Sequence, residues 1–384
     1  MTGRSGEAVD GAGLRRVHPT GSSRSEEVTF VSRLGAVSAA LVLAACCSHP
    51  LSGQGIGARA AEVEFGGRLH TQLATSSAAD GKSTDFFTRR ARLTIDVSVS
   101  SLLDARVQPD FGGGELELKD AYFRLNFDTG FRLWAGQFKR AFDIFQLDSS
   151  TDIVVVERTG RIDGVGVCAG PGGICALSRF SEKLGYSDRD IGIKADGSIG
   201  ERFTYMATLT NGTGSSGADE NSGKSLAGRV TLRLMDGLHL AGNVSRHDFV
   251  RGDGETDVAA AFGADLEFGR FRSGTHLQVG VIGGGNWRHE AATAAEIPGF
   301  LTWQAVVSRY VPVDGQGFEA IEPVARASWG DPNRDAEDDA GLLLTPGLFL
   351  YVKGKNRIGA NLDVYRPGSG DTEFSLKVQT YLYY

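Results

Sequence analysis

The chain ends in Glu373-Phe-Ser-Leu-Lys-Val-Gln-Thr-Tyr-Leu-Tyr-Tyr384, a run in which apolar and polar residues alternate. Successive side chains of a strand point to opposite faces, so Phe374, Leu376 and Val378 share one face and the polar residues between them share the other. The run therefore predicts a strand that is apolar on one face, polar on the other and aromatic at its end.

Runs of this kind recur from residue 62 to the C-terminus, and no long helical pattern interrupts them. In residues 88–98, for example, Leu93 and Ile95 alternate with Arg92 and Thr94. We predict about sixteen strands. They fall near residues 62–74, 86–98, 102–111, 115–127, 131–139, 188–198, 202–211, 224–235, 237–249, 256–268, 271–283, 299–310, 317–330, 340–352, 355–366 and 372–384.

The connections between these runs are of two kinds. Tight turns such as Asp236-Gly237 mostly alternate with longer polar connections such as 212–223. That alternation, with every second strand residue facing lipid, is typical of an outer-membrane β-barrel. The strand pattern alone also fits a β-sandwich whose polar face meets water, but an export signal and aromatic residues near the strand ends favour the barrel. We predict an all-β fold: a transmembrane antiparallel β-barrel of about 16 strands over residues 61–384, with both ends in the periplasm.

The composition agrees with a barrel. Of the 384 residues, 41% are hydrophobic, and no stretch after residue 60 is apolar for long enough to span a membrane as a helix. The chain has 53 glycines and 10 prolines, which suits turns and strands, because proline cannot donate a hydrogen bond to a sheet. The net charge of −7 argues against a nucleic-acid partner, since such a partner requires a basic face.

Residues 1–60 differ from the rest and predict an N-terminal extension and a signal peptide. The apolar run Leu34–Cys47 precedes small and polar residues, which is the order found in a secretory signal. Residues 1–28 are polar, and represent either a disordered extension or a start site assigned too early. The candidate processing sites are, in order of preference, Ala58-Arg-Ala60, Gly53-Gln-Gly55 and the lipoprotein-like Leu43-Ala-Ala-Cys46.

The longest connection runs from residue 140 to 187. A structureless segment of this length is usually functional, and Ile153-Val-Val-Val156 would be poor sequence for a solvent-exposed loop. We predict that residues 140–187 fold into the barrel as a constriction loop; the alternative is an external surface loop. Within it, Cys168 and Cys175 predict a disulfide in an oxidising compartment, and the alternative is two free thiols.

Five motifs resemble the phosphate-selective porin O and P family in order and spacing. They are Phe87-Thr-Arg-Arg-Ala-Arg-Leu93, Gln108-Pro-Asp-Phe111, Lys119-Asp-Ala-Tyr122, Ala135-Gly-Gln-Phe-Lys139 and Glu157-Arg158. The resemblance covers residues 62–165, and from 188 onward only the general barrel pattern remains. It implies a sixteen-stranded barrel, a homotrimer, a constriction loop after the fifth strand and lumenal arginines that attract anions such as phosphate.

Arginines are the candidate pore-lining residues. Some match the basic strand and the constriction loop of the family, and others fall on polar strand faces or in the long connection. The candidates are Arg89, Arg90, Arg92, Arg106, Arg124, Arg158 and Arg161. Acidic residues outnumber basic ones, 47 to 40, and several lie on the same strand faces. We therefore predict a weak anion or phosphate preference; the alternative is that the arginines pair with lumenal acids and brace the wall.

These features predict a passive, water-filled channel for small hydrophilic solutes in the outer membrane of a Gram-negative-type bacterium, in contact with lipid and lipopolysaccharide. The second interpretation is a barrel that acts as an adhesin or a membrane-embedded hydrolase. A hydrolase would require a serine–histidine pair near one rim, and His247 and His289 fall near predicted rims without a catalytic motif. We identify no catalytic residue, cofactor or metal site. Gly164-Val-Gly-Val-Cys-Ala169 matches a nucleotide-binding string but precedes no helix.

Overall fold

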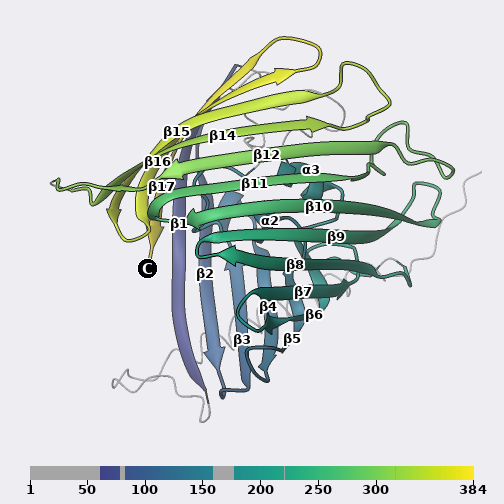
Figure 1. Cartoon of the computed structure of the whole chain (residues 1–384), viewed down its shortest axis with the longest axis horizontal. Coiled ribbons are helices and arrows are strands. Elements are labelled where there is room, and N and C mark those ends of the chain that lie inside the picture. Colours follow the sequence, from purple (N-terminus) through teal and green to yellow (C-terminus); the bar gives the residue numbers. More distant parts are fainter. Residues whose placement is uncertain (1–60, 78–82, 159–176, 220, 316) are drawn as a thin grey trace, which may run out of the picture. The chain divides into compact units, whose positions relative to one another are not determined.

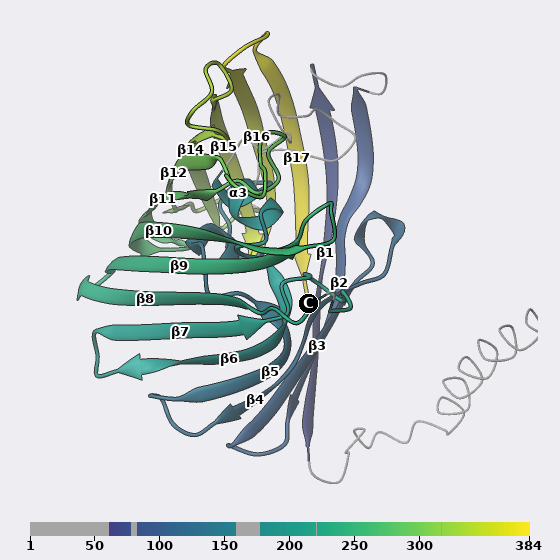
Figure 2. The same cartoon turned by 90° about the vertical axis from the view of Figure 1, so that its right-hand side faces the viewer.

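The strands close into a single barrel. The computed structural model describes residues 61–384 apart from 78–82, 159–176, 220 and 316. Apart from the short β13, each strand pairs antiparallel with the next strand in sequence, and β1 (Glu62–Ser76) also pairs with β17 (Glu373–Tyr383). Figure 1 and Figure 2 show the strands following one another around the sheet, with β17 beside β1. The closed sheet leaves no long edge whose backbone groups would meet lipid unpaired.

The other strands follow in sequence order. They are β2 (Thr84–Ser98), β3 (Leu103–Asp110), β4 (Glu117–Asn126), β5 (Arg132–Lys139), β6 (Arg189–Ile199), β7 (Phe203–Thr210), β8 (Ser225–Met235), β9 (Leu238–Val250), β10 (Thr256–Arg270), β11 (Ser273–Gly285), β12 (Gly299–Arg309), β13 (Val311–Pro312), β14 (Ala320–Asp331), β15 (Gly341–Lys353) and β16 (Asn356–Pro367). The two-residue β13 continues β12, since both pair with β14. The barrel thus has sixteen main strands, which confirms the predicted fold and number.

The first strand of the barrel meets the last residue of the chain at Gly67. The backbone N–H of Gly67 donates to the carbonyl oxygen of Tyr384 at 2.9 Å, and the N–H of Tyr384 donates back at 3.3 Å. A Cβ atom at residue 67 would lie 2.5 Å from the end of the Tyr384 ring, so a larger residue here would have to displace that ring. The last residue therefore takes part in closing the barrel.

The two faces of the sheet differ in polarity, as the alternation predicts. Large apolar side chains are exposed on the outer face, among them Phe86, Phe123, Ile193, Val230, Phe262, Trp303, Leu348 and Leu362. Polar and charged side chains are buried on the inner face, among them Arg92, Gln108, Lys194, Arg229, Asp265, Gln304, Arg326 and Lys377. Apolar side chains facing lipid and polar ones facing the lumen are the arrangement of a membrane barrel.

The connection between β5 and β6 carries two short helices, α2 (Ile144–Leu147) and α3 (Leu177–Lys183), neither of which the sequence predicts. We call the described parts of this connection, 140–158 and 177–188, the inner segment. The ring of Phe180 from α3 stacks on Phe300 of β12, with ring centroids 5.2 Å apart. Figure 2 shows α3 on the inner side of β11 and β12. None of the helices in the described part of the chain is long and apolar enough to cross a membrane.

The inner segment packs against one half of the wall. Its apolar side chains are buried together with inward residues of β8 to β12, β14, β15 and β17 in one hydrophobic cluster. From the inner segment the cluster includes Phe142, Ile144, Phe145, Val154, Val155, Val156, Phe180, Leu184 and Tyr186. From the wall it includes Ala227, Ala261, Ile282, Phe300, Val324, Phe349 and Tyr381. Burial of Ile153 to Val156 explains why these residues are apolar in a connection.

Several predictions concern residues outside the described part of the chain. The N-terminal extension and signal peptide in 1–60, the Cys168–Cys175 pair and Arg161 all fall there, so they stay predictions.

Candidate functional site

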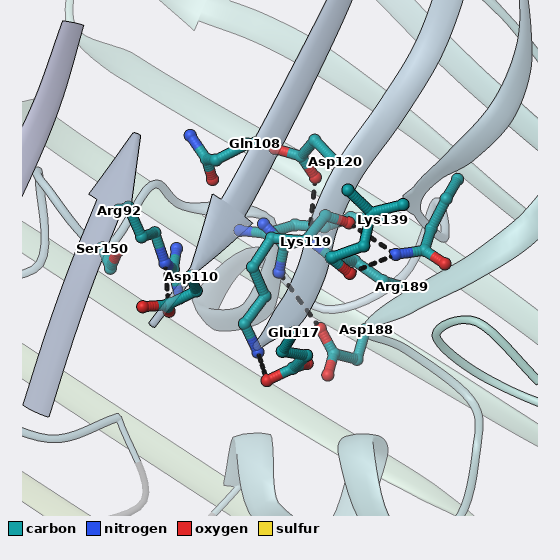
Figure 3. Close-up of polar contacts among 12 residues, drawn as sticks. Arg92, Gln108, Asp110, Glu117, Lys119, Asp120, Lys139, Ser150, Asp188 and Arg189 are labelled. Carbon is teal, nitrogen blue, oxygen red and sulfur yellow. Dashed lines mark hydrogen bonds and ion pairs between the residues drawn. The ribbon is translucent and has the colours of Figure 1, made fainter. Parts of the chain in front are cut away.

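A cavity of 490 Å³ lies between the inner segment and the wall formed by the first strands. We call it the basic cavity, because basic side chains predominate in its lining. The basic lining residues are Arg68, Arg89, Arg90, Arg92, Arg106, Lys119, Lys139, Arg158, Arg189 and Lys194. The acidic ones are Asp110, Glu117, Asp120, Glu182 and Asp188. Figure 3 shows part of this charged lining.

A bulge in β2 brings two consecutive arginines to the cavity. His70 pairs with Arg90 and Thr71 pairs with Thr88, so Arg89 is the extra residue on this strand. Neighbouring residues of a regular strand point to opposite faces, and a bulge changes that alternation. Both guanidinium groups consequently reach Glu157 of the inner segment. The sequence motif at residues 87–93 contains Arg89 and Arg90 but does not predict the bulge.

Three of the seven cavity arginines, Arg92, Arg106 and Arg189, have an acidic partner on another strand. The Nε atom of Arg92 lies 2.5 Å from Asp110, and the Nε atom of Arg189 lies 2.7 Å from Asp120. Figure 3 shows both contacts, together with an ion pair between Lys119 and Glu117. These pairs hold the side chains in place and offset part of their charge.

Two further predicted arginine positions also carry ion pairs. Arg106 makes a bidentate contact with Asp96, at 2.6 and 2.9 Å. Arg124 binds the carboxylate of Asp104 at 2.7 Å, and the same carboxylate accepts a hydrogen bond from the side-chain amide of Asn126. Both pairs connect adjacent strands and thus brace the wall, as the alternative interpretation of the arginines proposes.

Two cations stabilise the turn after α2. The Lys139 ammonium donates to the carbonyl oxygens of Gln146 and Asp148, both at 2.6 Å. Arg158 donates to the carbonyl oxygens of Phe145 and Asp148. Burial lowers the pKa of Arg158, and Asp148 opposes the shift. These contacts satisfy carbonyl groups that a short helix leaves without partners.

The structure brings five of the seven predicted arginines to the cavity lining. They are Arg89, Arg90, Arg92, Arg106 and Arg158. Arg124 does not line the cavity, and Arg161 lies outside the described residues. The predicted pore-lining residues do not include Arg68, Lys119, Lys139, Arg189 and Lys194, which also line the cavity. Lys119 and Lys139 lie in motifs that carry the family resemblance. The motifs therefore pointed to these two lysines, although the sequence alone gave no role for them.

A serine–histidine contact exists near the rim, but its hydroxyl is inaccessible. The Oγ atom of Ser225 lies 3.2 Å from Nδ1 of His247, and Ser225 is fully buried. The same hydroxyl accepts from the backbone N–H of Asp248 at 3.0 Å. The described residues contain no group of His, Cys, Asp and Glu side chains that could hold a metal ion. The buried contact between Ser225 and His247 gives no specific support to the hydrolase interpretation.

Comparison with known proteins agrees with the barrel. Among solved structures, the anion-selective porin from Comamonas acidovorans is 13% identical, covers 84% of this chain and 100% of its own, and superposes with a TM-score of 0.60. The trimer form of OmpT, an outer membrane protein of Vibrio cholerae, is 14% identical with a TM-score of 0.56, covering 84% of this chain and 100% of its own. OmpF of Salmonella typhi, solved with daunomycin, is 12% identical with a TM-score of 0.56, covering 86% of this chain and 99% of its own.

No curated protein matched the chain. The family model of the phosphate-selective porins O and P matches residues 63–249, a region that runs from β1 through β9 and includes the basic cavity. The porin fold and this match identify an outer-membrane channel. Over residues 63–249, just under half of its length, the chain is similar to the phosphate-selective porin O and P family.

Proposed function

We propose that the protein is a passive channel for small hydrophilic solutes and that its permeation path runs through the basic cavity with a weak preference for anions. The observation that carries this proposal is the lining of the cavity, in which basic side chains outnumber acidic ones two to one. Charges of one sign on low-dielectric walls focus their field into the lumen and raise the local concentration of counter-ions.

The ion pairs in the cavity support a weak rather than a strong preference. Arg92 and Arg189 each have a carboxylate within 2.7 Å, so much of their field is compensated locally. A tight phosphate site would require several unoccupied bidentate donors converging on one point. The anion-selective porin of similar fold and the family description add support for the sign of the preference, and phosphate is the anion that we propose to test first.

The inner segment is the proposed constriction loop. Its packing against β8 to β12, β14, β15 and β17 supports a pore confined to the side of the first strands. Deleting residues 150–180 should therefore raise single-channel conductance. A deletion of 332–339, in the external connection between β14 and β15, is the control and should leave it unchanged. An unchanged conductance after the first deletion would contradict the constriction.

The remaining parts of the proposal concern processing and assembly. Residues 1–60 would be removed as an extension and signal peptide, leaving residues 61–384 as the barrel domain. The mature barrel would lie in outer-membrane lipid and lipopolysaccharide, and would form a homotrimer like the OmpT trimer form. Cross-linking of the protein in native membranes tests the trimer, because a monomeric channel would give no three-chain product.

Planar-bilayer recording of purified, folded protein tests the proposed function. A tenfold KCl gradient should give a reversal potential displaced toward the chloride equilibrium potential. Heat-denatured protein from the same preparation is the control for contaminating porins. The absence of discrete conductance steps would reject the channel, and a potential displaced toward the potassium equilibrium potential would reject the anion preference alone.

A further inference from the structure

Glu157 of the inner segment contacts the arginine pair of β2 from behind. Its carboxylate makes a bidentate ion pair with Arg89, Nε at 2.5 Å and Nη2 at 3.1 Å, and lies 3.8 Å from Nη2 of Arg90. Glu157 is 3% exposed and does not line the basic cavity, whereas both arginines do. The two arginines therefore line the cavity, while the carboxylate that binds them does not.

The backbone around Glu157 is held by hydrogen bonds from β14 and β16. Arg326 of β14 donates through Nη1 to the carbonyl oxygens of Glu157 and Arg158, both at 2.8 Å. The N–H of Val156 donates to the side-chain oxygen of Asn361 on β16 at 2.6 Å. These backbone hydrogen bonds, together with the two arginines, therefore position the Glu157 carboxylate.

One buried carboxylate compensates half of the charge of the pair. Burial alone would raise the pKa of Glu157, but Arg89 and Arg90 outweigh burial and hold this pKa below its ordinary value. The group is therefore ionised at neutral pH. The Nε and Nη1 atoms of Arg90 are buried and have no hydrogen-bond partner among the described residues.

We propose that Glu157 is a specificity-determining residue of this channel, a fixed counter-ion that limits how strongly Arg89 and Arg90 attract anions. The inference rests on the proposed function of the basic cavity. Conduction requires that an ion enter a charged site and also leave it. A counter-ion behind the arginines weakens binding without obstructing the path, so anions pass rather than remain bound.

The substitution Glu157→Gln tests the proposal, because glutamine keeps the shape and can still accept a hydrogen bond from Arg89. Reversal potentials in a KCl gradient should move further toward the chloride equilibrium potential. Inorganic phosphate added to the bath should half-block the chloride current at a concentration roughly tenfold lower than for the unmodified protein, since one unit of positive charge is uncovered in a confined lumen.

Asp104→Asn is the matched control. It removes the same charge from another Arg–carboxylate pair inside the barrel, because Asp104 binds Arg124 at 2.7 Å, but neither residue lines the cavity. Its shift in selectivity and phosphate block should be less than about twofold, since charges further from the path are screened. An equal shift in the two variants, or no shift in Glu157→Gln, would overturn the proposal.

A double variant separates charge from loop positioning. Arg89→Gln with Glu157→Gln removes one charge of each sign, and should restore the phosphate block of the unmodified protein. If Glu157 served only to hold the inner segment, the double variant would stay altered and its conductance would change, which would overturn the proposal. Failure of the proposed function is seen separately, because the unmodified channel would then show no anion preference. The difference in selectivity between Glu157→Gln and Asp104→Asn would still test the role of Glu157.

Discussion

Asp143 is a buried carboxyl group at the base of the inner segment. It accepts hydrogen bonds from the N–H of Phe145 at 3.0 Å and from the hydroxyl of Ser181 at 2.5 Å. The residue has φ of 66°, a backbone conformation that aspartate tolerates better than most residues. Burial raises the pKa of Asp143 to about 7, and the two hydrogen bonds limit the rise.

This shift predicts how stability depends on pH. Between about pH 4, the ordinary value for aspartate, and pH 7, the native protein holds a proton at Asp143 that the unfolded chain has released. Rising pH therefore destabilises the native state, by at most about 1.4 kcal/mol per pH unit from this group. In Asp143→Asn this contribution should be absent. Melting temperatures of the detergent-folded unmodified protein and of Asp143→Asn, each at pH 5 and pH 8, measure this contribution. An equal change in melting temperature between the two pH values in both proteins would refute the prediction.

Arg158 illustrates a second prediction at the residue scale. Its side chain lines the basic cavity and binds the carbonyl oxygens of Phe145 and Asp148. Replacing it with glutamine should lower the chloride-to-potassium permeability ratio roughly two- to fivefold, as expected for one charge at close range in a medium of intermediate dielectric. Arg124→Gln, outside the cavity lining, is the control and should leave the ratio close to that of the unmodified channel.

At the scale of elements, Arg357 fastens the inner segment to β16. It is 2% exposed and donates to the carbonyl oxygens of Thr151 and Ile153 at 3.0 and 2.9 Å. Its guanidinium also lies over the rings of Tyr381 and Phe349, 4.4 and 5.3 Å from their centroids. Cation–π contacts and charged hydrogen bonds together make this a strong attachment.

Arg357→Gln should therefore loosen the segment. We expect a loss of about 2–3 kcal/mol in stability and frequent fluctuations of single-channel current, because two backbone carbonyl groups lose a charged donor. Arg366→Gln changes an exposed arginine of the same strand and serves as the control. Steady currents in Arg357→Gln, as quiet as those of the control, would show that other contacts suffice to hold the segment.

The sequence predicts the strands better than it predicts the inner segment. Strand positions depend on alternation within about ten residues, which can be read locally, and β9 at Leu238–Val250 matches its predicted range closely. Pairs such as Arg92 with Asp110 cross a single hairpin and lie within reach of such reasoning. The contact of Arg89 with Glu157 joins a bulge to a folded connection, so it depends on two irregular structures that alternation does not encode.

At the scale of the whole molecule, β17 closes the barrel. It pairs with β16 on one side and with β1 on the other, and Tyr384 extends the contact to Gly67. Deleting residues 373–384 should abolish insertion into the outer membrane, since two strands would be left with unpaired backbone groups in lipid. Tyr384→Phe keeps the ring and the backbone bonds, and should insert normally. Surface detection of the truncated chain at normal levels would contradict this prediction.

The hydrophobic cluster around the inner segment bears on the order of assembly. Residues such as Phe145 and Val156 precede in sequence most of the strands that cover them, and their apolar partners come from the second half of the chain. Until those strands arrive, this surface is exposed to water, as in the folding intermediates of soluble proteins. We expect the later strands to wrap around an already collapsed nucleus, so that the membrane barrel matures from the inside outward.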